Sequence, residues 1–166
     1  MSNAIDIRGT WRSEGAEDLG NGTFGYRKFD ITASRWGIEF TLFVDQSMQM
    51  PVFSVLFEGP YEIEGESSLG PGVYNAIFRF DKKSVTRKIE SNEIAANFGM
   101  QDLPVGQQRD ISATGYSFLP SVADYGQEYD LVKVDGGKLY LGARPADNNL
   151  STEDRRPTAL GYPLVK

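Results

Sequence analysis

The stretch WGIEFTLFVD, residues 36–45, carries an apolar side chain at every second position. In an extended chain, one face of this segment consists of Trp36, Ile38, Phe40, Leu42 and Val44. The opposite face is polar or small, apart from Phe43. A period of two residues is typical of a β-strand with one buried and one solvated face. The stretch therefore predicts a half-buried strand.

Weaker versions of the same alternation recur on both sides of this strand. They cover residues 27–33, 61–66, 74–81, 85–89 and 111–118. Short segments rich in Gly, Pro and Ser separate them, and residues 129–134 and 138–143 flank an Asp-Gly-Gly turn that suits a tight hairpin. Consecutive short strands joined by tight turns indicate an antiparallel meander.

The pattern predicts about eight strands and one short helix, for which Ser91 suits the N-cap and Gly99 the C-terminal end. An eight-stranded sheet has two open edges unless it closes. We therefore predict an all-β fold, an eight-stranded antiparallel up-and-down barrel, with a two-sheet sandwich as the alternative. A single domain spans residues 1–166. The barrel is expected at 7–144, and residues 145–166, with three Pro and no period, as an irregular strap.

The composition excludes several kinds of chemistry. The 166 residues include no Cys and no His. The chain therefore has no disulfide, no thiolate nucleophile, no imidazole-based catalytic triad and no His-ligated zinc or haem. We expect no metal, no cofactor and no catalytic residue.

The charge balance limits the partners. The chain has 17 basic and 23 acidic residues, a net charge of −6, which argues against nucleic acid because phosphate binding relies on Lys and Arg. The longest apolar runs, such as residues 52–57, are far shorter than the roughly 20 residues that cross a bilayer. The N-terminus lacks a basic region followed by an apolar run, so we expect a cytoplasmic protein, or a periplasmic or secreted one if a signal peptide has been removed.

Two sites in the sequence resemble the lipocalin (calycin) family. Gly9-Thr10-Trp11 matches the G-x-W with which lipocalins begin their first strand, and Arg144 directly follows the last predicted strand. The resemblance implies a lipocalin-like barrel in which Trp11 and Arg144 stack at the closed end. Such a cation–π contact contributes about 0.5 to 2 kcal/mol.

A longer resemblance covers residues 7–80. The chain is similar to the lipocalin-like domains of the adenomatosis polyposis coli down-regulated Wnt antagonists at Gly9, Trp11, Ser13, Glu17, Arg27, Phe29, Asp45, Pro51, Phe53, Gly59, Tyr61, Ser67 and Gly72. Ala16 and Met48 stand where that family has cysteines, so both members of the implied disulfide are absent. Their joint loss suggests a reducing compartment, or a core that does not need a crosslink. The resemblance implies a barrel that accommodates an acyl chain or a similar apolar ligand, but it does not imply Wnt antagonism.

The ligand-binding residues that we predict are the inward side chains of the barrel. They are Phe29, Trp36, Phe40, Leu42, Phe57, Tyr61, Tyr74, Phe78 and Tyr129. Aromatic walls with few polar groups are typical of small-molecule sites, although the same set would equally fill a packed core. Arg27 shares the parity of Phe29, and a buried cation needs a partner. Arg27 is therefore either an anchor for a ligand carboxylate or half of an internal salt bridge.

Three functions are open at this point. The first is the binding of a small hydrophobic ligand, such as a fatty acyl chain, in the barrel interior. The second is a metal-free isomerase or cyclase, which needs an ionisable group inside the barrel; Glu39, Asp45, Glu62 and Glu64 instead alternate with apolar residues, as surface charges do. The third is a solid-core structural or interaction module, in which residues 52–57, apolar on both faces, form a contact such as that of a homodimer.

Overall fold

The computed structural model describes residues 5–166, which form eleven β-strands, one short α-helix and one 3-10 turn. The strands are β1 (Gly9–Ser13), β2 (Glu17–Gly20), β3 (Thr23–Ile31), β4 (Arg35–Phe43), β5 (Pro51–Glu66), β6 (Tyr74–Arg79), β7 (Lys82–Arg87), β8 (Gln108–Asp110), β9 (Gln127–Asp135), β10 (Lys138–Gly142) and β11 (Leu160–Val165). Helix α1 covers Asn92–Ala96, and the 3-10 turn η1 covers Glu153–Arg155. No helix among the described residues is long and apolar enough to cross a membrane.

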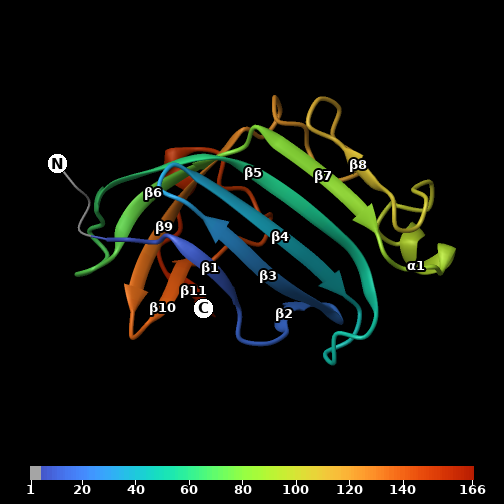
Figure 1. The fold of residues 1–166 in the computed structure, drawn as a ribbon, viewed down its shortest axis with the longest axis horizontal. Helices are drawn as coiled ribbons and strands as arrows, with labels where there is room; N and C mark the ends of the chain where they lie inside the picture. The colour runs from blue at the N-terminus through green and yellow to red at the C-terminus, as the bar shows by residue number, and fades with distance from the viewer. Residues whose placement is uncertain (1–4) are drawn as a thin grey trace.

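Eight of the strands close into one antiparallel barrel (Figure 1). Around the barrel the order is β1, β3, β4, β5, β6, β9, β10 and β11. The circuit closes where β11 pairs with β1, with Arg12 opposite Val165. The predicted all-β antiparallel barrel is confirmed. Closure pairs the two edges that an open sheet would leave exposed.

The eighth barrel strand lies in the segment that the sequence predicted to be an irregular strap. β11 pairs with both β1 and β10, so the expected barrel limits of 7–144 are wrong. Pro163 hides this strand in the sequence, because proline cannot donate to a ladder and is rare in central strands. Its neighbour Leu164 is completely buried in the barrel core, which favours the extended conformation. Of the predicted strap, residues 145–159 and Lys166 lie outside strands.

β5 is sixteen residues long, and two strands follow one another along one of its edges. β6 pairs with its second half and β7 with its first half. Gly59 lies where this edge passes from one partner to the other, and a Cβ there would lie 2.0 Å from the carbonyl oxygen of Arg79. Only glycine fits this close approach. β7 and β8 thus extend the sheet beyond the barrel (Figure 1).

The protein has two hydrophobic cores. The barrel core fills the interior and includes Trp11, Phe29, Trp36, Phe78 and Leu139. The second core lies between the β5–β7 extension and residues 88–126, which we call the insert; it contains Val52, Phe53, Val55, Val85, Ala95, Met100, Leu103, Ile111 and Leu119. The doubly apolar run at residues 52–57 therefore contacts the insert of the same chain.

The insert contains the predicted helix but not the predicted strand at 111–118. Ser91 is the N-cap of α1 and accepts a hydrogen bond from the backbone N–H of Ile94 at 3.2 Å, as expected. Tyr116 and Leu119 instead form an isolated bridge that closes a tight turn. The weak alternation there reflects burial of single side chains against the second core rather than a ladder.

Candidate functional site

Aromatic rings fill the centre of the barrel. The ring of Trp36 lies 5.1 Å from that of Phe78 and 5.4 Å from that of Phe80, centroid to centroid. Phe29 follows at 6.3 Å, and the indole N–H of Trp36 donates to the carbonyl oxygen of Arg79 at 2.8 Å. Edge-to-face contacts at such distances stabilise beyond the area that they bury. Phe29, Trp36 and Phe78 come together as predicted, but they pack against one another.

Three further predicted lining residues lie around this cluster. Tyr61 stacks on Phe78 at 5.8 Å, and its hydroxyl donates to a carbonyl oxygen of the β3–β4 turn at 2.7 Å. Tyr74 is half-buried against the barrel core. Phe57 lies between the two cores, 5.7 Å from Phe80. These residues form a packed wall.

Tyr129 does not face the barrel interior, so its assignment to the lining is wrong. Its neighbours Glu128 and Asp130 pair with Phe78 and Ala76, the core-facing residues of β6. Tyr129 therefore points outward, beneath the C-terminal segment, and its backbone N–H donates to that segment at 2.8 Å. Because the segment covers the outer side of β9, this strand is buried on both faces. Alternation could not distinguish the inner face from the outer one.

Two carboxylates of β9 consequently face the interior, which the sequence analysis missed. Glu128 accepts hydrogen bonds from the hydroxyl of Tyr125 at 2.8 Å and from the guanidinium of Arg144 at 3.2 Å. Asp130 is 2% exposed and accepts two backbone N–H groups, at 2.8 and 2.9 Å. Burial raises the pKa of Asp130 to about 6, because it disfavours the charged form. The spacing of both acids from Val132, by two and four residues, was the signal that could have revealed them.

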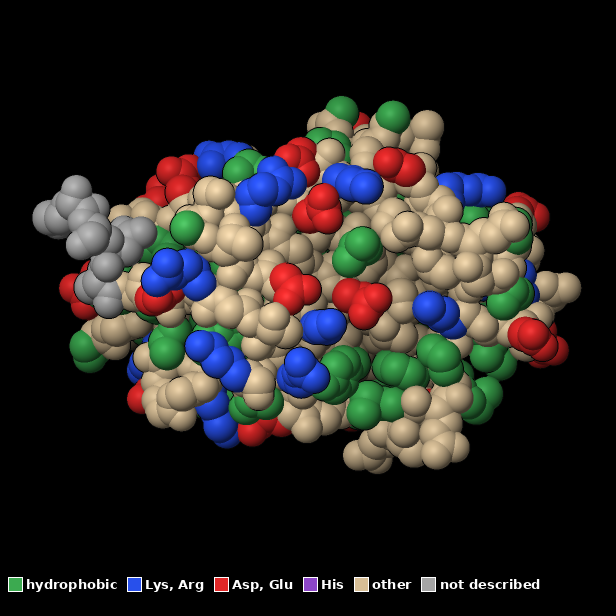
Figure 2. All heavy atoms as spheres, viewed as in Figure 1, with side chains coloured by type: hydrophobic (Ala, Val, Ile, Leu, Met, Phe, Trp, Pro, Cys, Tyr) green, Lys and Arg blue, Asp and Glu red, His purple; other side chains and the backbone are tan. Residues whose placement is uncertain are grey.

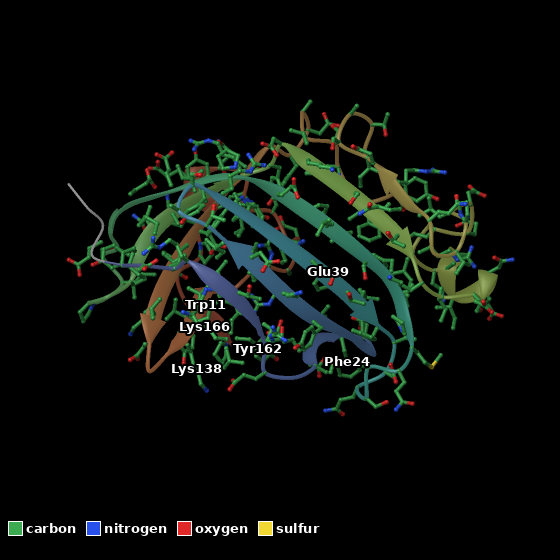
Figure 3. All side chains as sticks on the ribbon, viewed as in Figure 1. Trp11, Phe24, Glu39, Lys138, Tyr162 and Lys166 are labelled. Atoms are coloured by element: carbon green, nitrogen blue, oxygen red, sulfur yellow. The ribbon has the colours of Figure 1, made fainter. Side chains whose placement is uncertain are left out.

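Trp11 and Arg144 do not form the closed-end stack that the lipocalin resemblance implies. Trp11 is 2% exposed, donates its indole N–H to the carbonyl oxygen of Ile7 at 2.9 Å, and has the ammonium of Lys166 4.9 Å from its ring centroid (Figure 3). Arg144 instead forms an ion pair with Glu128. The predicted cation–π partner of Trp11, Arg144, is therefore wrong, and Lys166 is the cation beside this ring. Lys166 reaches Trp11 because it follows β11, the strand that the sequence did not reveal.

Arg27 faces the interior and forms an internal salt bridge. Its Nε and Nη2 atoms donate to the two carboxylate oxygens of Glu17, both at 2.8 Å, and Nη2 also donates to the carbonyl oxygen of Tyr162 at 3.1 Å. The side chains of Arg27 and Glu17 are only 18% and 8% exposed. A bidentate pair of this kind satisfies both charges. Arg27 therefore already has a carboxylate partner within the protein.

The inward face of β4 changes along its length. Trp36 is 5% exposed, whereas Phe40 and Leu42 on the same face are only partly buried. Leu19 of β2 is 49% exposed, and both it and Phe40 reach within 3.2 Å of the position that a Cβ on Gly25 would take. On the outer face of the sheet, hydrophobic side chains gather over β2 and the adjacent ends of β3 and β4 (Figure 2), where Phe24 lies (Figure 3). We call the apolar region formed by Leu19, Phe40 and Leu42 the open end; Phe40 and Leu42 are partly buried there and pack against the second core.

Two hollows lie on the outside of the protein. The larger, about 390 Å³, lies over Gly37 on the outer face of β3, β4 and β5, and charged side chains surround it, among them Glu39 (Figure 3). The smaller, about 320 Å³, lies between the β5–β6 loop, β9 and the start of β11. Within residues 5–166, no three acidic side chains are placed to hold a metal ion.

No protein-family model matches the chain, and no curated protein matches it either. A functional assignment therefore depends on the geometry of the barrel and its open end.

Proposed function

We propose that the protein binds a small hydrophobic molecule, such as a fatty acyl chain, at the open end of its barrel. The observation that supports this most directly is the change along β4, whose inward face is buried at Trp36 but only partly buried at Phe40 and Leu42, beside the exposed Leu19. Covering such apolar surface contributes about 25 cal/mol per Å². The packed rings around Trp36 limit how deeply a ligand enters.

Apolar packing continues from the open end towards the insert. Leu42 lies opposite Phe53 of β5, and the ring of Phe53 lies 5.8 Å from that of Phe118. Phe118 is 58% exposed. Phe53 itself is 2% exposed, so it joins the open end to Phe118 through buried packing.

Polar groups border the open end on β3. Arg27 lies opposite Phe40 and forms a salt bridge with Glu17. The pair carries no net charge but is polar, and it lies beside the apolar surface. A few polar groups beside an apolar surface are typical of sites that orient a small ligand. The resemblance of residues 7–80 to lipocalin-like domains supports the same proposal, because barrels of that family accommodate apolar ligands.

Binding of a fluorescent fatty acid tests the proposal with two matched variants. Leu42→Asp introduces a charge on the inward face, and Leu56→Asp introduces the same charge on the outward face of β5; both leucines are partly buried. We expect Leu42→Asp to weaken binding about tenfold or more, or about 1.4 kcal/mol, and Leu56→Asp to bind like the wild type. Equal affinities of the two variants, each with a native far-UV circular dichroism spectrum, would exclude the open end.

The packed barrel centre favours one second candidate, a solid-core interaction module. In that case the exposed side chains of Leu19 and Phe118 contact another protein or a second copy of the chain. Analytical ultracentrifugation of the wild type and of Phe118→Ser distinguishes the two functions. A dimer that Phe118→Ser abolishes would support the module, and a monomer at every concentration would rule out the homodimer.

A further inference from the structure

The smaller hollow on the outer wall of the barrel is separate from the open end. It is lined by residues 69–71 and 73 of the β5–β6 loop, by Lys133 of β9 and by residues 158–160. Its volume of about 320 Å³ falls at the lower limit of small-molecule sites, which is about 300 to 1,000 Å³. The hollow therefore has room for a ligand much smaller than a long acyl chain.

Backbone irregularities on both sides shape this hollow. The register shifts between Ile63 and Glu66 where β5 pairs with β6, and again between Tyr140 and Gly142 where β10 pairs with β11. Such bulges bend strands and are frequent beside functional sites. Gly72 adds a positive φ of 77°, a conformation that favours glycine. These backbone features lie in or beside the segments that line the hollow.

The chemistry of the lining is apolar with one cation. Leu69 is 46% exposed and Val73 is buried, and both line the hollow together with Leu160. Lys133 is the one charged residue in the lining. The nearest carboxylate oxygen is that of Asp135, 3.9 Å from the ammonium, and the Asp135 side chain is 69% exposed. Solvent-exposed pairs at this distance are weak, so the ammonium is free to bind another anion.

We propose that this hollow binds a short-chain carboxylic acid. The alkyl chain lies between Leu69 and Leu160, and the carboxylate contacts the ammonium of Lys133, with the hydroxyl of Thr158 as a further donor. Charge complementarity selects this ligand, because a cation in an otherwise apolar lining favours an anion with an apolar body. An alkylammonium of equal length would bring a second positive charge to Lys133. The site uses none of the open-end residues and goes beyond the function proposed above.

Amide NMR titration of the full chain with hexanoate tests this site. We expect saturable shifts at residues 69–73, 133 and 158–160, and no such shifts with hexylammonium. Lys133→Gln should weaken hexanoate at least fivefold and leave the weak binding of hexanol unchanged, because only the charge contact is lost. Lys88→Gln, which removes an exposed lysine far from the hollow, is the matched control.

Three outcomes would overturn the proposal. These are hexanoate shifts confined to the open end, an affinity that Lys133→Gln leaves unchanged, and the absence of any saturable shift. Because the open end is tested with Leu42→Asp and a long-chain ligand, the two proposals can fail independently of each other.

Discussion

The barrel core and the second core bury their backbone in different ways. Every barrel strand has a neighbour on each side, so the ladders satisfy its N–H and C=O groups. The insert, residues 88–126, has only the five-residue helix α1 and the three-residue strand β8. Its buried carbonyl groups therefore need other donors, and two buried cations of β7 supply them. An irregular segment enters a core when side chains replace the missing ladder.

Arg87 is the larger of these two donors. It is 3% exposed and makes five hydrogen bonds, of 2.7 to 3.2 Å, to the carbonyl oxygens of Ile89, Glu90, Gln101 and Leu103 and to Oδ1 of Asn92. These contacts use the full donor capacity of a guanidinium group. Arg87 thereby fixes the first half of the insert to the end of β7.

Lys83 does the same for the other half of the insert. It is 1% exposed, and its ammonium donates to the carbonyl oxygens of Pro120, Ser121 and Tyr125 at 3.0, 3.2 and 2.8 Å. The ammonium also lies 4.6 Å from the ring centroid of Phe80, in the barrel core. Burial lowers the pKa of Lys83 to about 8. Lys83 therefore joins the end of the insert to the barrel.

Among the substitutions that test the difference between the two cores, Arg87→Met is expected to have the largest effect on stability. The variant keeps an apolar stem but leaves four buried carbonyl groups without their donor, so we expect a loss of about 3 to 5 kcal/mol in the free energy of unfolding. Urea denaturation measures the loss, and Lys88→Met, at an exposed neighbour, is the control. Amide hydrogen exchange should accelerate in residues 89–103 before it does in the barrel strands. A loss as small as that of the control would contradict the role of Arg87.

A second test concerns Asp130, where the barrel core contains a buried charge of its own. The pKa of Asp130 is 3.8 in the unfolded chain and about 6 in the folded protein, so Asp130 stays protonated to a higher pH in the folded state. The stability that this group contributes falls as the pH rises from about 4 to 6. Asp130→Asn keeps an acceptor for the two backbone N–H groups without the charge. We expect a gain of up to about 3 kcal/mol at pH 7 and almost none at pH 4.

Thermal or urea unfolding at the two pH values measures this gain. Asp124→Asn, at an exposed position of the preceding loop, is the matched control and should change stability little at either pH. If Asp130→Asn gains equally at pH 4 and pH 7, the gain does not come from the buried charge.

The smallest expected effect is that of Lys83→Met. Three carbonyl groups lose their donor, but the cost of burying an ammonium disappears as well, so we expect a net loss of about 2 kcal/mol. Lys82→Met, at the exposed neighbour, should change stability by less than about 0.5 kcal/mol. Hydrogen exchange should show faster opening of residues 120–125 alone. Uniformly faster exchange of the whole barrel would mean that Lys83 supports the barrel rather than the insert.

Part of the fold could be predicted because burial repeats locally in the sequence. The alternation at residues 36–45 corresponds to β4, and Ser91 caps the predicted helix. The same rule failed for β9, where both faces are covered, and for β11, where Pro163 interrupts the pattern. Alternation of apolar and polar residues indicates a strand with one solvent-exposed face. A strand that is buried on both faces lacks this alternation.

The amino-acid sequence by itself determined the class of fold and the apolar faces of its strands, because these depend on the order of side chains along an extended chain. Only the tertiary structure decided which groups meet across long separations. It pairs Arg27 with Glu17, places Lys166 on Trp11, and directs Lys83 into the carbonyl groups of the insert. The physical reason is that such partners depend on strand register and on the segments that cover each strand. Neither can be predicted from the local periodicity of the sequence.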